Sequence, residues 1–224
     1  FYYDSESNRG VVIEWGTDGS RSDVFAHFEK FPEWSYETGD ALRSVAVSAD
    51  GEYIVAGSKD DKIYLFDKDS STPLWSYGTG NDVVSVALSA DGEYIVAGSN
   101  DNKVYFFDKD SSTPLWSYET GNDVHSVAIS AEGEYIAAGC YDDEVYLFHK
   151  DSSTPLWSYE TGNDVHSVAI SADGEYIAAG SDDNKVYLFD KDSSTPPWSY
   201  ETGNDVQPVA ISADGEYILS RIYI

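Results

Sequence analysis

The stretch SVALSADGEYIVAGS, residues 85–99, decides the fold of this chain, because near-copies of it recur at a fixed spacing. Small and bulky residues alternate before an Asp-Gly pair and a second apolar segment follows it, a pattern typical of two β-strands joined by a tight turn. The central part of this stretch, Ser-Ala-Asp-Gly-Glu-Tyr from Ser89, begins again at Ser48, Ser171 and Ser212, and at Ser130 with Glu132 in place of Asp. A tryptophan keeps the same step of 41 residues at Trp34, Trp75, Trp116, Trp157 and Trp198. Such a period indicates one supersecondary unit copied in tandem, each copy burying its apolar faces against its neighbours.

One repeat reads as four strands, which we expect over 83–89, 94–98, 104–107 and 115–118. The Asp91-Gly92 pair marks the first turn, since glycine adopts a positive φ without cost. Pro114 precedes the outer strand, where a missing N–H is tolerated. Helix signals are absent from the pattern. Four antiparallel strands in 41 residues predict an all-β fold, a β-propeller built of four-stranded blades.

The copies suggest five blades in a single domain over 1–224. Complete repeats are expected over about 42–82, 83–123, 124–164 and 165–205. The fifth blade would be composite, from about 11–37 plus 206–224, with outer strands over 22–28 and 33–37. Joining both ends of a chain in one blade leaves no open edge. Residues 11–15 and 217–224 both suit the second strand of that blade, so one would lie outside it. A larger ring, or pairing with another copy, is the alternative.

The repeat resembles the WD-repeat family of β-propellers in residues 85–92, 97–101 and 104–108, and the resemblance extends over about 20–220. It implies that a turn aspartate in each blade accepts backbone N–H groups of the second hairpin. The residues that match this aspartate are Asp60, Asp101, Asp142 and Asp183.

Two departures from the WD pattern are clear. Phe-Asp or Phe-His stands in place of Trp-Asp, and Thr-Gly-Asn-Asp, as at 79–82, replaces the Gly-His pair. The family's buried His–Asp–Trp network therefore cannot form as such. The run PLWSYETG also resembles the repeats of pyrroloquinoline-quinone-type propellers, which places the chain between the two families.

Charge bounds the class of partner. The chain carries 41 acidic and 13 basic residues, a net charge of −28, spread through every repeat. Such a surface repels nucleic acid and anionic membranes and favours basic partners. The acidity also resembles that of proteins working at high salt, which is the simpler explanation of the charge. No apolar run approaches the roughly 18 residues of a membrane span. The chain begins at Phe1 rather than Met and shows no leader, so we lean toward a secreted or cell-surface protein.

Differences among the repeats gather at two positions. The residue before the first-strand serine varies across Arg43, Val84, His125, His166 and Gln207. The second-hairpin turn varies across Lys59, Asn100, Tyr141 and Asp182. Both positions lie on the same face of a propeller, around its channel. This predicts a recognition face for a protein or peptide, and drift at solvent-exposed positions is an equally weighted explanation.

The outer-strand tryptophans have two readings. We expect them to fill the space between blades, because aromatic rings bury much area. The alternative is a multivalent lectin-like module whose sugar-stacking rings are Trp75, Trp116, Trp157 and Trp198. A third possibility is a structural ring within a larger surface protein.

No enzyme, cofactor or metal site is predicted. His125 and His166 lie in adjacent blades, but no third ligand stands at a matching repeat position, so solvated surface histidines are the preferred reading. Nucleophile elbows and phosphate-binding glycine loops are missing from the sequence. The single cysteine, Cys140, excludes an intrachain disulfide and occupies a serine position, so we expect a packed, inert thiol.

Overall fold

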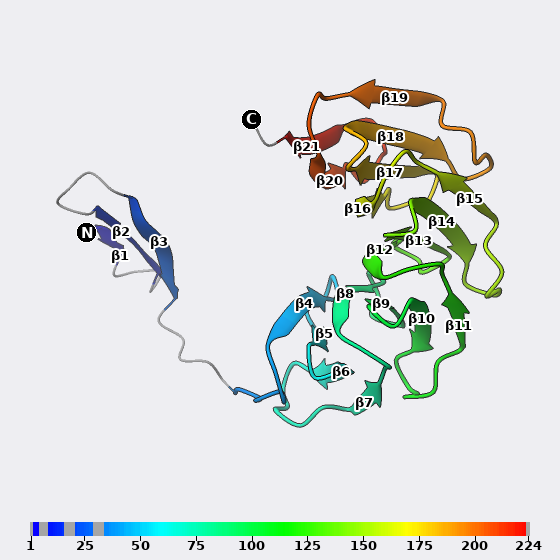
Figure 1. Cartoon of the computed structure of the whole chain (residues 1–224). Coiled ribbons are helices and arrows are strands. Elements are labelled where there is room, and N and C mark those ends of the chain that lie inside the picture. The colour runs from blue at the N-terminus through cyan, green and yellow to red at the C-terminus, as the bar shows by residue number, and fades with distance from the viewer. Residues whose placement is uncertain (1, 5–8, 16–20, 29–33, 223–224) are drawn as a thin grey trace. The chain divides into compact units, whose positions relative to one another are not determined.

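A computed structural model describes residues 2–4, 9–15, 21–28 and 34–222 (Figure 1). The chain divides into two compact units, Phe1–Tyr36 and Glu37–Ile224. The first unit holds a three-stranded antiparallel sheet in the order β1-β2-β3. Its strands are β1 (Tyr2–Asp4), β2 (Arg9–Trp15) and β3 (Arg21–Phe28). Nowhere among the described residues is there a helix of the length and apolar character needed to cross a membrane.

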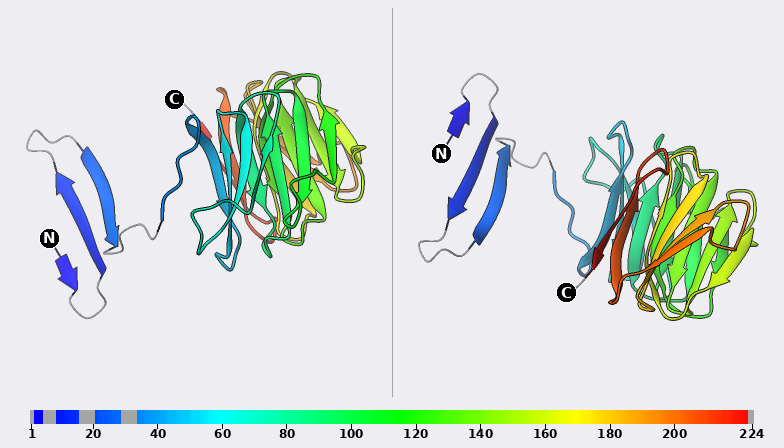
Figure 2. Two further views of the ribbon diagram at one scale, coloured as in Figure 1. Left: turned by 90° about the horizontal axis from the view of Figure 1, so that it is seen from below. Right: turned by 90° about the horizontal axis from the view of Figure 1, so that it is seen from above.

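The second unit consists of antiparallel sheets that follow one another in chain order (Figures 1 and 2). The first blade is β4 (Leu42–Val47), β5 (Tyr53–Ser58), β6 (Lys62–Asp67) and β7 (Trp75–Gly78). The second blade is β8 (Val83–Leu88), β9 (Tyr94–Ser99), β10 (Lys103–Asp108) and β11 (Trp116–Glu119). The third blade is β12 (Val124–Ile129), β13 (Tyr135–Cys140), β14 (Glu144–His149) and β15 (Trp157–Glu160). The fourth blade is β16 (Val165–Ile170), β17 (Tyr176–Ser181), β18 (Lys185–Asp190) and β19 (Trp198–Glu201). A two-stranded sheet, β20 (Val206–Ile211) and β21 (Ile218–Ile222), follows them.

This architecture confirms the all-β, blade-based propeller fold. The four strands expected in the repeat over 83–118 match β8 to β11, with ends within one residue. The composite closing blade and the count of five stay predictions. In the described structure β2 pairs with β3, and β20 pairs with β21. Residues 34–38 form no strand, so the outer strand expected over 33–37 is not seen there, and residue 33 lies outside the described residues.

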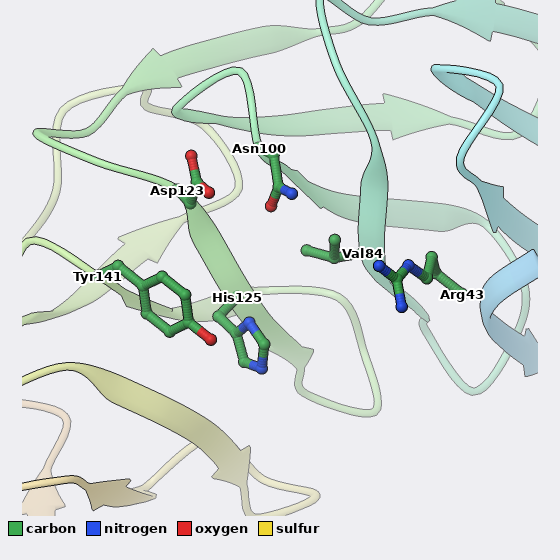
Figure 3. A pocket seen from close by; sticks show the side chains of 6 residues that line it. All are labelled: Arg43, Val84, Asn100, Asp123, His125 and Tyr141. Carbon is green, nitrogen blue, oxygen red and sulfur yellow. The ribbon is translucent and has the colours of Figure 1, made fainter.

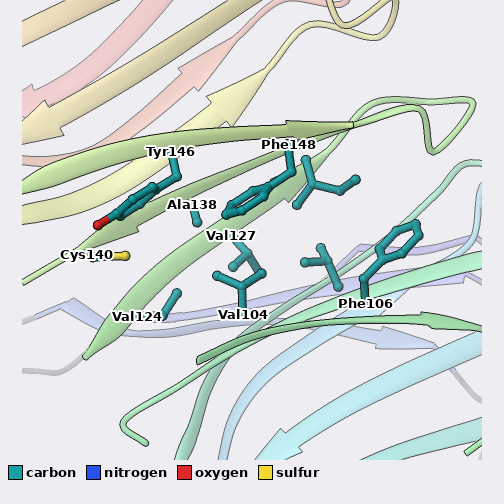
Figure 4. Packing of buried hydrophobic residues seen from close by; sticks show 10 residues of the cluster. Val104, Phe106, Val124, Val127, Ala138, Cys140, Tyr146 and Phe148 are labelled. Atoms are coloured by element: carbon teal, nitrogen blue, oxygen red, sulfur yellow. The ribbon is translucent and has the colours of Figure 1, made fainter. Parts of the chain in front are cut away.

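Apolar side chains hold consecutive blades together. Figure 4 shows the cluster between the second and third blades, where Phe106 of β10 and Phe148 of β14 are fully buried. Val124 and Val127 of the inner strand β12 pack into the same cluster. Burying one such side chain contributes about 1.5–3 kcal/mol, so each junction is a small hydrophobic core of its own.

Hydrogen bonds at repeat-equivalent positions add to each junction. The Ser85 hydroxyl oxygen accepts the N–H of Val127 in the next blade at 3.0 Å. The Ala90 N–H donates to the carbonyl of Ala131 at 2.9 Å. The same bonds recur from the first blade through to β20, because the residues that make them recur every 41 positions.

A glycine lets neighbouring sheets approach closely. A Cβ built on Gly98 of β9 would lie 2.7 Å from Cγ1 of Val124 in the next blade, which real side chains do not tolerate. The equivalent glycines, each facing a valine of the following inner strand, are Gly57, Gly139 and Gly180. This glycine is therefore a requirement of blade packing.

The turn aspartates organise the end of each blade that carries the variable residues. One carboxylate oxygen of Asp101 accepts the Gly80 N–H at 2.7 Å and the Tyr105 hydroxyl at 2.6 Å. Its other oxygen accepts the Lys103 N–H at 3.2 Å. Asp60, Asp142 and Asp183 accept the equivalent glycine and tyrosine donors. A tyrosine hydroxyl and a backbone amide thus occupy the place of the His–Asp–Trp network.

Candidate functional site

A pocket of about 310 Å³ opens where the variable residues of three consecutive blades meet (Figure 3). We call the surface formed by the variable positions before the inner-strand serine and in the second-hairpin turn the mouth face. The pocket is lined by Arg43, Val84, Asn100, Asp123, His125 and Tyr141. Five of these six were predicted from repeat variation, so the structure brings together residues that lie up to 98 positions apart in the sequence (141 minus 43).

Two further predicted residues, His166 and Asp182, lie in the fourth blade next to Tyr141 of the pocket. The hydroxyl of Tyr141 lies 3.3 Å from Nδ1 of His166. Nε2 of His166 lies 2.7 Å from a carboxylate oxygen of Asp182. Lys59, in the β5–β6 turn, and Gln207, on β20, hold the equivalent positions in their sheets but do not line this pocket.

The histidines are packed against aromatic rings rather than solvated, which corrects the expectation from sequence. His125 stacks on Tyr141 with ring centroids 4.7 Å apart and an interplanar angle of 18°. His166 meets His125 edge-on at 5.1 Å, and its side chain is only 13% exposed. The edge-on contact follows from the blade geometry, because the adjacent inner strands β12 and β16 place their second residues side by side, whereas the stack of His125 on Tyr141 forms within the third blade.

Burial shapes the electrostatics of the mouth face. Desolvation lowers the pKa of His125, and the nearby His166 and Arg43 lower it further, so the neutral imidazole is favoured. Burial also raises the pKa of the Asp123 carboxyl, with a smaller contribution from Asp101. Arg43 lies 3.9 Å from Asp82, an ion pair between partly exposed groups.

Repeat variation alone missed a row of carboxylates. Asp82, Asp123 and Asp164 stand at the same position in three successive blades, just before the inner strand. Differences between repeats cannot reveal them, because these three residues are identical. Their regular recurrence immediately before variable residues was the available signal.

The outer-strand tryptophans lie between blades. Nε1–H of Trp116 donates to the carbonyl of Lys150 in the next blade at 2.8 Å, and its ring lies 5.3 Å from that of Phe148. Trp75 and Trp157 make the equivalent contacts. Trp198 is 45% exposed and stacks on Tyr200. In three of the four indoles, therefore, the Nε1–H group is hydrogen-bonded to the next blade and the ring packs against a phenylalanine of that blade.

Cys140 is fully buried in β13, at the position that Ser58, Ser99 and Ser181 hold in the other blades. Burial raises the pKa of its thiol well above the usual range. A buried, protonated thiol is a weak nucleophile. The residue therefore acts as a small packing group.

Repeated four-stranded antiparallel blades, joined through equivalent junctions, define a β-propeller repeat protein. Two family models match the sequence. The family described as outer membrane protein assembly factor BamB matches residues 15–140, more than half of the chain, and the WD domain, G-beta repeat, matches residues 153–190. The chain belongs to the family of propeller repeats described as outer membrane protein assembly factor BamB, and its residues 153–190 are similar to a WD repeat. A comparison with curated proteins gave no match.

Proposed function

We propose that this chain is a non-catalytic propeller scaffold that binds a protein or peptide partner on its mouth face. The observation that carries the proposal is the pocket in which unlike residues from three like blades converge. Both matched families consist of propeller repeats, which commonly serve as protein-interacting scaffolds. Drift alone gives no reason for the variable side chains to pack against one another.

Charge favours a basic partner. The chain carries a net charge of −28, and Asp82 and Asp123 lie at the pocket or beside it. The stacked rings of His125 and Tyr141 add an aromatic surface for a cationic side chain. A volume of about 310 Å³ suits one or two side chains of a peptide rather than a large cofactor.

A non-catalytic role is supported by the surroundings of the hydroxyl groups. The inner-strand serines that a sequence search would offer as nucleophiles are engaged at blade junctions, as Ser126 is with the N–H of Val168 at 3.1 Å. No cofactor is part of the proposal. A lectin-like module and a structural ring remain the alternatives, and the packed indoles favour neither.

Binding of a library of lysine- and arginine-containing peptides tests the proposal. The double variant H125V/Y141N places the residues of the second blade, Val84 and Asn100, in the third, so the fold is expected to tolerate it. We expect it to weaken the best peptide at least about tenfold, as for a residue at the centre of an interface. The matched control K59N changes the same turn outside the pocket and should bind as wild type.

Three outcomes would contradict the proposal. Equal affinity of wild type and H125V/Y141N would place the partner elsewhere. Glycan binding that persists at high salt and is unaffected by H125V/Y141N would favour the lectin-like alternative. A folded chain that binds neither peptides nor glycans would favour the structural ring.

A further inference from the structure

We propose that Asp164, His166 and Asp182, all in the fourth blade, form a binding site for a divalent transition-metal ion of the zinc type. One donor atom from each residue lies within 4.8 Å of the other two. The site shares His166 and Asp182 with the mouth face, but metal binding does not depend on the proposed binding of a peptide.

The backbone brings the three residues together before any ion binds. Asp164 ends the segment leading into β16, His166 is the second residue of that strand, and Asp182 lies in the β17–β18 turn. The Asp182 N–H donates to the Asp164 carbonyl at 2.9 Å, which fastens the segment to the turn. A register shift between Val165 and Ser167 places His166 at an irregularity of the β16–β17 pairing. Such irregularities re-aim side chains.

The imidazole of His166 is oriented from the neighbouring blade. The Tyr141 hydroxyl lies 3.3 Å from Nδ1, and His125 packs edge-on against the ring. Nε2 is thereby directed at the carboxylate of Asp182, 2.7 Å away. Metal-binding histidines usually have their second nitrogen held in this manner, which fixes the ring and its tautomer.

One carboxylate oxygen of this cluster is left unpaired. The second carboxylate oxygen of Asp182, Oδ1, is buried and has no hydrogen-bond partner among the described residues. Leaving a buried acceptor unpaired is costly. A cation held between the carboxylates and the imidazole would compensate this oxygen and the repulsion between the two acids.

The donor set selects the class of metal. One imidazole nitrogen with two carboxylate oxygens suits zinc and its neighbours, whereas calcium and magnesium prefer oxygen ligands only. Ligands at about 2.0–2.2 Å in tetrahedral geometry stand about 3.3 Å apart. The separation of 2.7 Å between Nε2 and Asp182 would therefore widen by only about half an ångström on binding. Three protein ligands leave a fourth position for water or for a group from a partner.

The other blades show what the site would lose. The same three positions hold Asp82, Val84 and Asn100 in the second blade. In the third blade they hold Asp123, His125 and Tyr141. Only the fourth blade, among the four complete ones, has a metal donor of carboxylate or imidazole type at all three. All three ligands come from one blade, so a third ligand at the matching position of another blade is not needed.

Zinc titration of the metal-stripped full chain tests the site, with bound metal counted after desalting and with calcium and magnesium as comparison ions. We expect one Zn²⁺ per chain, a higher Tm with zinc, and a shift of the His166 imidazole NMR signals. The variant H166V/D182N installs the residues of the second blade and should weaken zinc binding about 100-fold or more while the metal-free Tm stays close to that of wild type.

A control variant tests whether zinc binds instead at His149, another histidine beside an aspartate. His149 lies 3.6 Å from Asp151 and stands where other blades carry Asp67, Asp108 and Asp190. H149D should therefore fold and bind zinc as wild type does. Equal zinc binding by H166V/D182N, or no zinc bound by folded wild type, would overturn the proposal and leave His166 and Asp182 as an ion pair alone.

Discussion

The junctions between blades and the β20–β21 sheet carry different residues at the same two repeat positions. At each junction a glycine and a serine contact the next inner strand. Gly180 leaves room for Val206, and the Ser167 hydroxyl oxygen accepts the N–H of Val209. On the β20–β21 sheet those two positions hold Arg221 and Pro208. The face of this sheet directed away from the fourth blade, the trailing face, therefore lacks both features on which a following blade would pack.

Equivalent residues are buried inside a junction and exposed on a sheet face that no described blade covers. Val86, in the inner strand of the second blade, is 6% exposed, whereas its counterpart Val45 in β4 is 61% exposed. Leu219 on the trailing face is 75% exposed, although its counterpart Ala178 is fully buried in the junction before it. Packing between blades, rather than the sequence of a blade alone, decides what is core.

The largest expected loss of stability comes from placing an arginine, as at position 221 of the last sheet, at the glycine position of a junction. G139R puts an arginine where a Cβ would already lie 2.7 Å from Val165. We expect the free energy of unfolding to fall by about 3 kcal/mol or more, because the junction has no space for the arginine side chain and would bury its charge. The midpoint and slope of urea denaturation measure it.

The matched control is G78E, since Gly78 has open space around it and other blades carry glutamate at its position. This change should alter stability by no more than about 0.5 kcal/mol. Similar destabilisation by both variants would mean that the close approach of the sheets is not what the glycine serves.

The next effect compares two equivalent valines. V86A removes two methyl groups from a buried junction and should cost about 2 kcal/mol, whereas V45A at an exposed position should cost less than about 0.5 kcal/mol. Thermal or urea unfolding of the two variants gives the difference directly. An equal loss would show that the face of β4 is covered in solution.

A smaller effect is expected from one junction hydrogen bond. S126A removes the acceptor of the Val168 N–H and should cost about 1–2 kcal/mol, because a buried donor is left unpaired. S117A, on an exposed part of the outer strand β11, serves as the control. If S126A changes the free energy of unfolding as little as S117A does, water or a rearranged backbone must accept the Val168 N–H in place of the serine.

The smallest effect is a pH dependence at the mouth end of one junction. Burial lowers the pKa of His125 below 6.5, so the unfolded chain binds its proton more readily than the folded one. Its contribution to stability is therefore present above pH 6.5 and declines as the pH falls through that value toward the folded pKa. Subtracting the stability curve of H125V from that of wild type should reveal this decline, and parallel curves would contradict it.

The sequence predicted blades well because each strand is a short alternating segment bounded by turn residues, and 41-residue copies repeat the signal. The pairing of β2 with β3 was not predicted, since residues 1–33 lack the repeated letters. At the mouth face, variation located Tyr141 and His166 but not their contact. Asp164 stayed hidden because it is the same in every neighbouring repeat. Depth of burial, which separates a solvated histidine from a stacked one, depends on the adjacent blade.

The alanine-to-alanine bonds that link successive blades, from Ala49 through Ala90 onward, have a consequence for how such a chain changes over time. Every group in a junction belongs to a position that each complete repeat supplies. Loss of residues 83–123, one whole repeat, would bring Ser44 to Val127 and Gly57 to Val124, the same pairs of residue types as before. The number of blades can therefore change by whole units without a new interface having to arise.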